Sequence, residues 1–165
     1  MSGTPATSVS TSDTRSPGTS ALVLVVAECL WGHIQKVTFE LLGDARKLAL
    51  SLKARVEVAL LTSPSNRAGA IRELRPYVQE RLQLVEHPLL QDYSTGTHVR
   101  AMELLLERIS PNVVMLGATA NGRDLGPRVA ARLGMGYIPH CLVIRAGAER
   151  QLNICLLYTS PSPRD

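Results

Sequence analysis

The chain has 165 residues and a mass of 17.9 kDa, with 45% hydrophobic and 19% charged residues. These values are typical of one soluble domain, since a single hydrophobic core commonly closes at about 100–200 residues. The longest apolar run, Ala21–Ala27, is followed at once by Glu28. No segment reaches the roughly 20 apolar residues that a membrane-spanning helix needs, so we expect no membrane insertion.

The net charge of +4 and the pI near 9.3 raise the question of a nucleic-acid partner. Basic residues alternate with acidic ones, as in Arg72, Glu73 and Arg75, and aromatic residues make up only 4%. This pattern favours a mixed, solvated surface and no nucleic-acid binding. The three cysteines, Cys29, Cys141 and Cys155, are too scattered for a disulfide framework or a zinc knuckle, which favours a reducing cytoplasm.

Residues 1–20 consist almost entirely of Ser, Thr, Gly, Pro and Ala. Such a segment cannot bury enough apolar surface to offset the entropy lost on ordering, so we predict a disordered leader. It has neither the apolar core of a secretion signal nor the Arg-rich amphipathic pattern of an organelle signal. The expected location is therefore a bacterial-type cytoplasm, with the mitochondrial matrix as the lesser alternative.

From Ala21 onward, short apolar runs alternate with segments of helical spacing, which is typical of a parallel sheet covered by helices. The predicted strands are Ala21–Ala27, Val56–Thr62, Leu82–Val85, Asn112–Gly117 and Ile138–Ile144. Regular alternation of this kind predicts right-handed crossovers and a three-layer, doubly wound, Rossmann-like α/β fold with five mostly parallel strands. We expect Ala21–Ala27 and Asn112–Gly117 to be adjacent central strands, because they are the most continuously apolar.

Four helices fit between these strands, over Thr38–Leu52, Ala68–Tyr77, Thr97–Ile109 and from about Pro127 to Gly134. Thr38 is placed to cap the first helix. Pro127 suits a first helical turn, and Gly134 can adopt the left-handed conformation of a C-terminal cap.

The end of the chain departs from this alternation. Residues 155–165 place two prolines among serines, and we interpret them as a non-native-looking tail, either a read-through artefact or an ordinary disordered segment. The predicted folded domain therefore covers residues 21–154.

One loop has the features of an anion site. It follows the apolar strand Asn112–Gly117 and leads into a helix, which is where open α/β sheets bind ligands. Glycines allow the backbone to approach an anion, and amides at a helix start favour negative charge. The candidate residues for binding an anion or a partner are Gly117, Thr119, Gly122, Arg123 and Asp124.

The loop departs from the known phosphate-binding motifs. Arg123 and Asp124 stand where a P-loop needs Lys followed by Ser or Thr, and the first strand lacks the G-x-G-x-x-G of dinucleotide sites. A purely structural alternative also exists. Asp124, Arg128 and Arg132 are spaced four residues apart and can form a ladder of charges along one helix.

Three stretches together resemble a known family. They are ALVLVVAE from Ala21, the segment Thr38–Ala49, and GATANGRDLGPRVAARLG from Gly117 to Gly134. They are similar to the N-terminal domain of the electron-transfer flavoprotein alpha subunit, and the similarity covers roughly residues 21–154. Cys29 is a departure, because family members often carry His at this position.

The resemblance implies a scaffold domain without catalytic residues, and so an electron carrier subunit and not an enzyme. It implies a heterodimer with a beta subunit, which transfers electrons from acyl-CoA-type dehydrogenases through FAD to a quinone oxidoreductase. It also implies that a second alpha domain holds most of the FAD. We expect that domain to be missing from this chain, so this fragment alone should be colourless and inactive.

Two other classes of protein are alternatives to this interpretation. One is a free-standing adenine-nucleotide-binding module of the stress-protein kind, and the other, less favoured, is a small enzyme. No metal site is expected, since Cys29 and His33 are interpreted as an ordinary core thiol and histidine, and adjacent His140 and Cys141 would point to opposite faces of a strand. His87 and His98 are interpreted as surface or capping residues. Trp31 is expected to pack on the domain, with a partner contact as the alternative.

Overall fold

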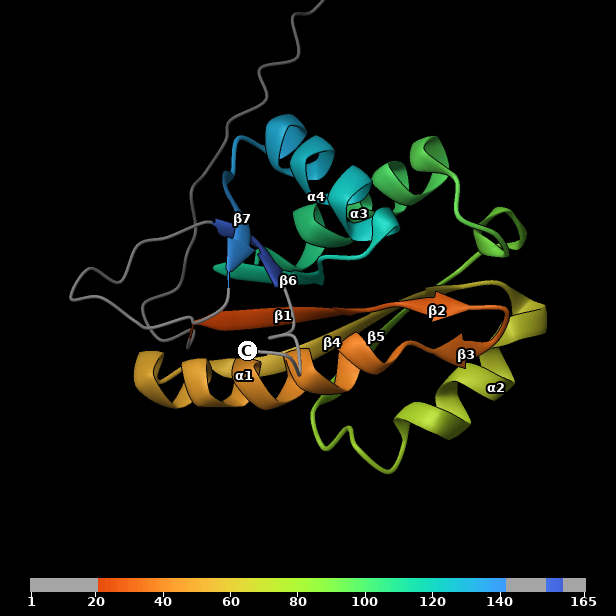
Figure 1. Ribbon diagram of the computed structural model, residues 1–165, viewed down its shortest axis with the longest axis horizontal. Coiled ribbons are helices and arrows are strands. Elements are labelled where there is room, and N and C mark those ends of the chain that lie inside the picture. Colours follow the sequence, from red (N-terminus) through yellow and green to blue (C-terminus); the bar gives the residue numbers. More distant parts are fainter. Residues whose placement is uncertain (1–20, 142–153, 159–165) are drawn as a thin grey trace, which may run out of the picture.

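The computed structural model describes residues 21–141 and 154–158. The predicted leader 1–20, residues 142–144 of the last predicted strand and the tail from residue 159 lie outside the described residues. Figure 1 shows three layers, with a sheet between two pairs of helices. Helices α1 (Lys36–Leu52) and α2 (Pro64–Leu74) cover one face, and helices α3 (Thr95–Ile109) and α4 (Ala120–Leu133) cover the other. The predicted doubly wound α/β fold is confirmed.

The main sheet has the strand order β5-β4-β1-β6-β8-β7, and every neighbouring pair in it is parallel. Its strands are β1 (Leu22–Ala27), β4 (Arg55–Thr62), β5 (Arg81–Glu86), β6 (Val113–Gly117), β7 (Gly136–Cys141) and β8 (Ile154–Tyr158). The predicted adjacency of the first strand and the Asn112–Gly117 strand is confirmed, because Val23 registers with Val113. A separate antiparallel hairpin, β2 (Cys29–Leu30) and β3 (His33–Ile34), follows β1.

The continuous apolar run of β1 arises because the strand is buried on both faces. Successive strand side chains point to opposite sides. Val23 and Val25 accordingly join the core beneath α1 and α2, whereas Leu24 and Val26 join the core beneath α3 and α4. A central parallel strand between two helical layers therefore needs no polar position.

The first helix begins earlier than predicted and is capped differently. Helix α1 covers Lys36–Leu52, and its N-cap residue is Gln35. Thr38 lies inside the helix and is fully buried, and its hydroxyl accepts the backbone N–H of Glu28 at 3.0 Å. The prediction that Thr38 caps this helix is wrong, because the hydroxyl satisfies the chain leaving β1 instead.

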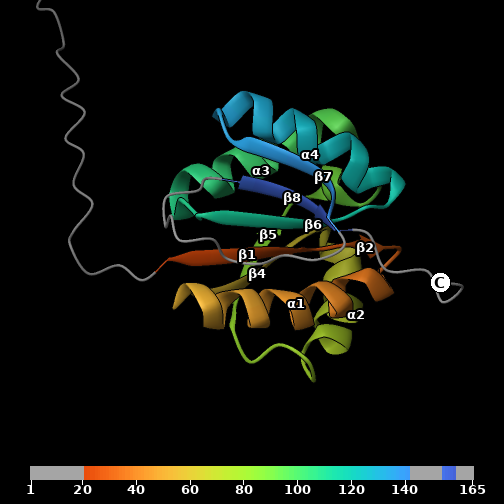
Figure 2. The same ribbon diagram turned by 60° about the vertical axis from the view of Figure 1, so that its left-hand side comes forward.

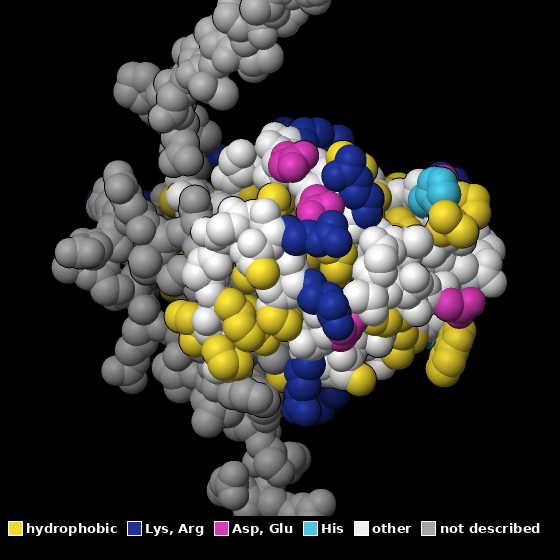
Figure 3. All heavy atoms as spheres, turned by 90° about the horizontal axis from the view of Figure 1, so that it is seen from above, with side chains coloured by type: hydrophobic (Ala, Val, Ile, Leu, Met, Phe, Trp, Pro, Cys, Tyr) yellow, Lys and Arg dark blue, Asp and Glu magenta, His cyan; other side chains and the backbone are white. Residues whose placement is uncertain are grey.

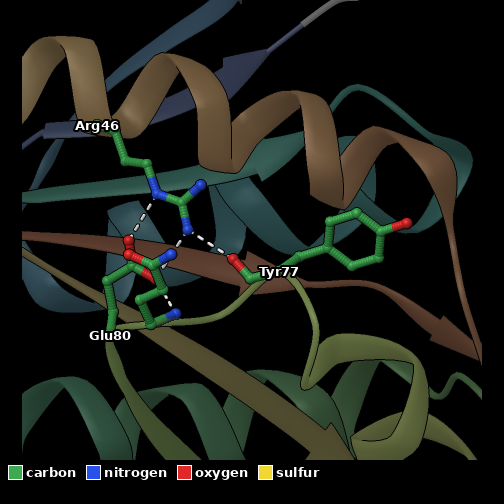
Figure 4. A network of polar contacts seen from close by, with 4 residues as sticks. Arg46, Tyr77 and Glu80 are labelled. Atoms are coloured by element: carbon green, nitrogen blue, oxygen red, sulfur yellow. Dashed lines mark hydrogen bonds and ion pairs between the residues drawn. The ribbon is translucent and has the colours of Figure 1, made fainter.

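Helix α2 covers Pro64–Leu74, displaced towards the N-terminus from the predicted Ala68–Tyr77. The Ser63 hydroxyl accepts the N–H of Asn66, and Pro64 occupies the first turn, where a missing amide hydrogen costs little. The loop after α2 is held against α1 by Arg46, whose guanidinium donates to Glu80 at 2.6 Å and to the Tyr77 carbonyl at 2.6 Å (Figure 4).

Helices α3 (Thr95–Ile109) and α4 (Ala120–Leu133) cover the opposite face. Helix α4 begins seven residues before Pro127, so the predicted start is wrong. Pro127 is accommodated inside the helix after Gly126, which has no Cβ to clash with the proline ring. The predicted end is confirmed, since Gly134 has φ +62° and its N–H donates to the Ala130 carbonyl.

The sheet has six strands where the sequence predicted five. The additional strand is β8, which includes residues 155–158 of the predicted tail 155–165, so the folded domain extends beyond its predicted end at residue 154. It pairs with β6 on one side and β7 on the other. A strand inserted between two neighbours contributes hydrogen bonds on both edges, which local periodicity does not report. The described part of β7 ends at Cys141, where the prediction continued to Ile144.

The order of the strands defines where a ligand can be reached. The chain passes from β1 to β4 and β5, then returns through α3 to β6 on the other side of β1. Ligands of open parallel sheets bind at this reversal, beyond the carboxyl ends of the two strands. Figure 2 shows β1 and β6 side by side between the helical layers. In the part of the chain that the structure describes, no helix has the length and hydropathy to cross a bilayer.

Candidate functional site

A pocket lies at the carboxyl ends of β1 and β6, beside the start of α4. Its volume is about 60 Å³. A pocket of this volume holds only a few water molecules, because each occupies roughly 10–15 Å³ on this measure. Its lining is apolar at Val26, Leu61, Leu90, Leu116 and Leu125, and polar at Glu28, Cys29, Tyr93, His98 and Asn121.

The predicted anion loop forms one wall of this pocket, and two of its residues have roles within the fold. The Thr119 hydroxyl caps α4 by accepting the N–H of Gly122 at 3.1 Å. At Gly117, a Cβ atom would lie 2.8 Å from a methyl group of Val37. The glycine therefore makes room for α1. The threonine hydroxyl accepts the hydrogen bond that this amide at the helix start could otherwise donate to an anion.

Glu28 places a carboxylate beside the start of α4. Asn121 donates its side-chain amide to Glu28 Oε1 at 3.4 Å. Burial raises the pKa of Glu28, although hydrogen bonds from Thr119 and Asn121 oppose the rise. When ionised, this carboxylate would repel an incoming phosphate, which the start of a helix otherwise attracts. Binding of an anion by this loop stays a prediction.

Asp124 is the centre of the densest polar network in this region. Tyr93 donates to its Oδ2 at 2.8 Å, Thr95 to the same oxygen at 2.6 Å, and Arg128 to its Oδ1 at 2.8 Å. Hydrogen bonds from Thr95, Arg128 and Tyr93 lower the pKa of Asp124 to about 2. Burial and the Asp124 carboxylate together raise the pKa of Tyr93 to about 12.

The predicted ladder of charges forms in its first step only. Arg128 pairs with Asp124 at the predicted spacing, but Arg132 reaches across to Glu103 of α3 at 3.0 Å. Figure 3 shows basic side chains beside acidic ones on this face of the molecule. Arg123 is exposed, and among the described residues its side chain has no hydrogen bond or ion pair. Sequence reasoning missed Tyr93 and Thr95, because they precede Asp124 by 31 and 29 residues and meet it only through the fold.

The histidines and the thiol near the pocket do not form a reactive pair. His87 caps the short 3₁₀ helix η1 (Pro88–Leu90) by accepting the N–H of Leu89, which confirms its predicted capping role. Burial lowers the pKa of His98, whose Nδ1 contacts the Ser94 carbonyl. Burial raises the pKa of the Cys29 thiol, so it stays protonated and weakly nucleophilic. No three His, Cys, Asp or Glu side chains meet in metal-binding geometry within residues 21–141 and 154–158.

Trp31 contradicts the packing prediction. It occupies the turn of the β2–β3 hairpin, and 78% of its surface is exposed. A tryptophan in a loop is expected to cover apolar surface, but here the turn geometry directs the indole away from the domain.

Comparison of the chain with known proteins identifies its family. A family model for the electron transfer flavoprotein domain matches residues 23–159. The chain belongs to this family, and relatives named as its alpha subunit or as FixB place it with the alpha-type chains. A FixB protein of Clostridium saccharobutylicum is 36% identical over 140 residues, which are 85% of this chain and 40% of that protein.

Other relatives extend the picture. The electron transfer flavoprotein subunit alpha of Thermoanaerobacterium thermosaccharolyticum is 34% identical over 85% of this chain and 41% of its own length. The LctC subunit of a lactate dehydrogenase (NAD(+),ferredoxin) of Acetobacterium woodii is 32% identical over 85% of this chain and 32% of its own. The chain thus spans about 40% of the length of the first two relatives and less of the third.

A solved universal stress protein in complex with cAMP is similar at 13% identity, covering 84% of this chain and 96% of that one, with a TM-score of 0.48. This likeness is too low to bear on fold or ligand.

The pocket at the β1–β6 reversal does not fit the flavin of this family. Pockets for ligands of drug or cofactor size enclose roughly 300–1,000 Å³, several times its volume of about 60 Å³. Glu28 would also face a pyrophosphate placed at the start of α4. No step of flavin chemistry can be assigned to these residues.

Proposed function

We propose that this chain is the N-terminal scaffold domain of an electron transfer flavoprotein alpha subunit. It docks a beta subunit, while a further alpha domain holds most of the FAD. The assembled heterodimer carries electrons from acyl-CoA-type dehydrogenases through FAD to a quinone oxidoreductase in fatty acid β-oxidation, and it works in the cytoplasm. The chain itself is a carrier component and not an enzyme.

The observation that carries the proposal is the family match over residues 23–159, joined to relatives of the alpha type. Two features of the pocket support a scaffold role. Its polar groups are engaged with one another, as Glu28 is with Asn121, and the Cys29 thiol is held in its protonated form. In a site that binds a cofactor or a substrate, polar side chains of this kind would point into the open pocket without partners in the fold.

A chimera tests the proposal. Residues 23–159 replace the matched segment of the Clostridium saccharobutylicum FixB protein, and the chimera is produced together with that organism's beta subunit. We expect a heterodimer that contains flavin and accepts electrons from an acyl-CoA dehydrogenase. A chimera that is folded by circular dichroism but remains a monomer would contradict the scaffold role.

The isolated chain provides the complementary measurement. After incubation with excess FAD and removal of unbound cofactor, it should show no flavin absorbance, and calorimetry with AMP and ATP should show no binding. A nucleotide affinity in the micromolar range would instead support the alternative of a free-standing adenine-nucleotide module.

A further inference from the structure

The turn between β2 and β3 places Trp31 in a backbone conformation that its side chain disfavours. Trp31 has φ +50° and Gly32 has φ +82°, so both central residues of this two-residue turn have positive φ. Hairpin turns of this type favour Asn, Asp or Gly, because a side chain with φ above zero crowds the following carbonyl. Because 78% of its surface is exposed, the indole adds little packing energy that could offset this strain. Strained backbone positions of this kind cluster at functional sites.

The hairpin is held firmly at its base. Both carboxylate oxygens of Glu73 bind it, one contacting His33 Nδ1 at 2.7 Å and the other accepting the Ile34 N–H at 2.8 Å. Gly69 of α2 lies so close that a Cβ atom there would be 2.9 Å from the Gly32 carbonyl oxygen. The hairpin tip is therefore presented in one orientation before any partner arrives, which lowers the entropy cost of binding.

A second exposed apolar residue lies at the same edge of the sheet. Leu89 of η1 is 63% exposed. Asn66 connects the two regions, since it lies beside Gly32 and donates its side-chain amide to the Gln91 carbonyl at 3.4 Å. Figure 1 shows the hairpin and the loop that contains η1 at the same end of the sheet, with α2 beneath the hairpin.

The charge beside the hairpin is positive. Helix α2 and its C-cap carry Arg67, Arg72 and Arg75 against one acid, Glu73, whose two oxygens are directed to the hairpin. Arg67 is paired with Glu86 of β5, whereas Arg72 and Arg75 are exposed. A surface that complements this region offers an apolar pocket with carboxylates at its rim.

We propose that the β2–β3 hairpin is the anchor by which this domain docks its beta subunit. Trp31 inserts into an apolar pocket of that subunit, and acidic side chains around the pocket meet Arg72. Binding hot spots are enriched in tryptophan and arginine, and they fill well-packed pockets of the partner. This inference rests on the proposed function and adds the surface and the residue that carry the association.

The substitution Trp31→Asn separates docking from folding, because its two effects have opposite signs. Asn tolerates the left-handed conformation, so the full chain should unfold about 2–5 °C higher than the wild type. Binding to the beta subunit from the same organism, measured by surface plasmon resonance, should weaken by at least about 30-fold. Arg72→Glu should slow association several-fold and reduce its dependence on salt.

Leu50→Gln is the matched control, since Leu50 of α1 is 82% exposed and lies on another element. It should leave beta-subunit affinity unchanged. If Trp31→Asn binds as tightly as the wild type, or if it lowers the unfolding temperature, the anchor role is overturned while the proposed function stands. If the wild-type chain does not bind the beta subunit at all, the proposed function and this inference both fail.

Discussion

Two turns at the carboxyl edge of the sheet show opposite uses of polar and apolar groups. In the segment that leads into α4, the Thr119 hydroxyl accepts the N–H of Gly122, and the Asn121 side chain donates to Glu28. The β2–β3 hairpin directs Trp31 outward and uses its polar neighbours only to fix its base. The loop carries the motif that resembles a ligand site, whereas the hairpin carries no motif at all.

Glycine-rich spacing alone therefore leaves two roles open for a loop, ligand binding and internal packing. A loop is available to a ligand when its amides and side chains lack partners in the fold. In this domain, the loop entering α4 supports the packing of α1 and α4, and the hairpin is the part held ready for contact. Four substitutions test this comparison.

Gly117→Val should have the largest effect. The new side chain would overlap Val37 of α1 at less than 3 Å, and overpacking a full core costs about 3 kcal/mol of unfolding free energy. Urea unfolding measures the loss. If the variant is as stable as the wild type, the glycine does not serve packing, and anion binding becomes the better explanation for it.

Gly69→Ala should have the next largest effect and acts on the hairpin. Alanine normally stabilises a helix interior relative to glycine, but here its methyl group would meet the Gly32 carbonyl at 2.9 Å. We expect the free energy of unfolding to fall by about 1–2 kcal/mol in total, because the hairpin backbone at Gly32 would have to move. Gly43→Ala in α1 is the matched control. No atom lies within 4 Å of its Cβ position, so it should gain about 0.5–1 kcal/mol.

Thr119→Ala should remove the cap of α4 and cost about 1 kcal/mol in thermal or urea unfolding. Thr119→Ser keeps the hydroxyl and should recover most of that loss. Thr119→Ala also removes a hydrogen bond that opposes the rise in the pKa of Glu28, so the pKa of Glu28 should rise further in this variant. A carbon-13 titration of the carboxyl group would show it. An unchanged stability would mean that the hydroxyl is available to a ligand after all.

Tyr93→Phe should have the smallest effect at neutral pH, about 0.5 kcal/mol, because the network around Asp124 is partly exposed. Its pH dependence is more informative. The pKa of Tyr93 is raised from 10.0 to about 12, so the unfolded chain ionises first. Its contribution is therefore complete below pH 10 and is lost as the pH rises towards 12. The difference in stability between wild type and variant should shrink over this range and stay constant from pH 6 to 9.

Elements buried on both sides were predictable, and helix starts were less so. The runs around Val23–Val26 and Val113–Leu116 are apolar throughout because both faces of the sheet are covered, and that pattern is unmistakable in one dimension. The predicted start of α4 is wrong because proline is common in a first helical turn and Pro127 was placed there, whereas Thr119 caps the helix. A threonine three residues before a glycine is a weak signal beside a proline.

The sequence predicted where the candidate loop lies, but not which residues its side chains contact. The loop from Gly117 to Asp124 lies at the switch between β1 and β6, as its place after an apolar strand indicated. Its partners came from distant segments. Glu28 meets Asn121 across 93 residues, and Asp124 meets Thr95 across 29. Periodicity reports which face a residue takes on its own element and nothing about which residue it meets there.

The sequence by itself determined the doubly wound parallel sheet, the pairing of β1 with β6 and the end of α4 at Gly134, because each follows from burial or from backbone conformation within a few residues. The tertiary structure decided the rest. It placed β8 between β6 and β7, gave the α4 loop its internal partners and left Trp31 exposed. These outcomes depend on which surfaces meet after the chain has crossed the sheet, and such long-range contacts leave no trace in local spacing.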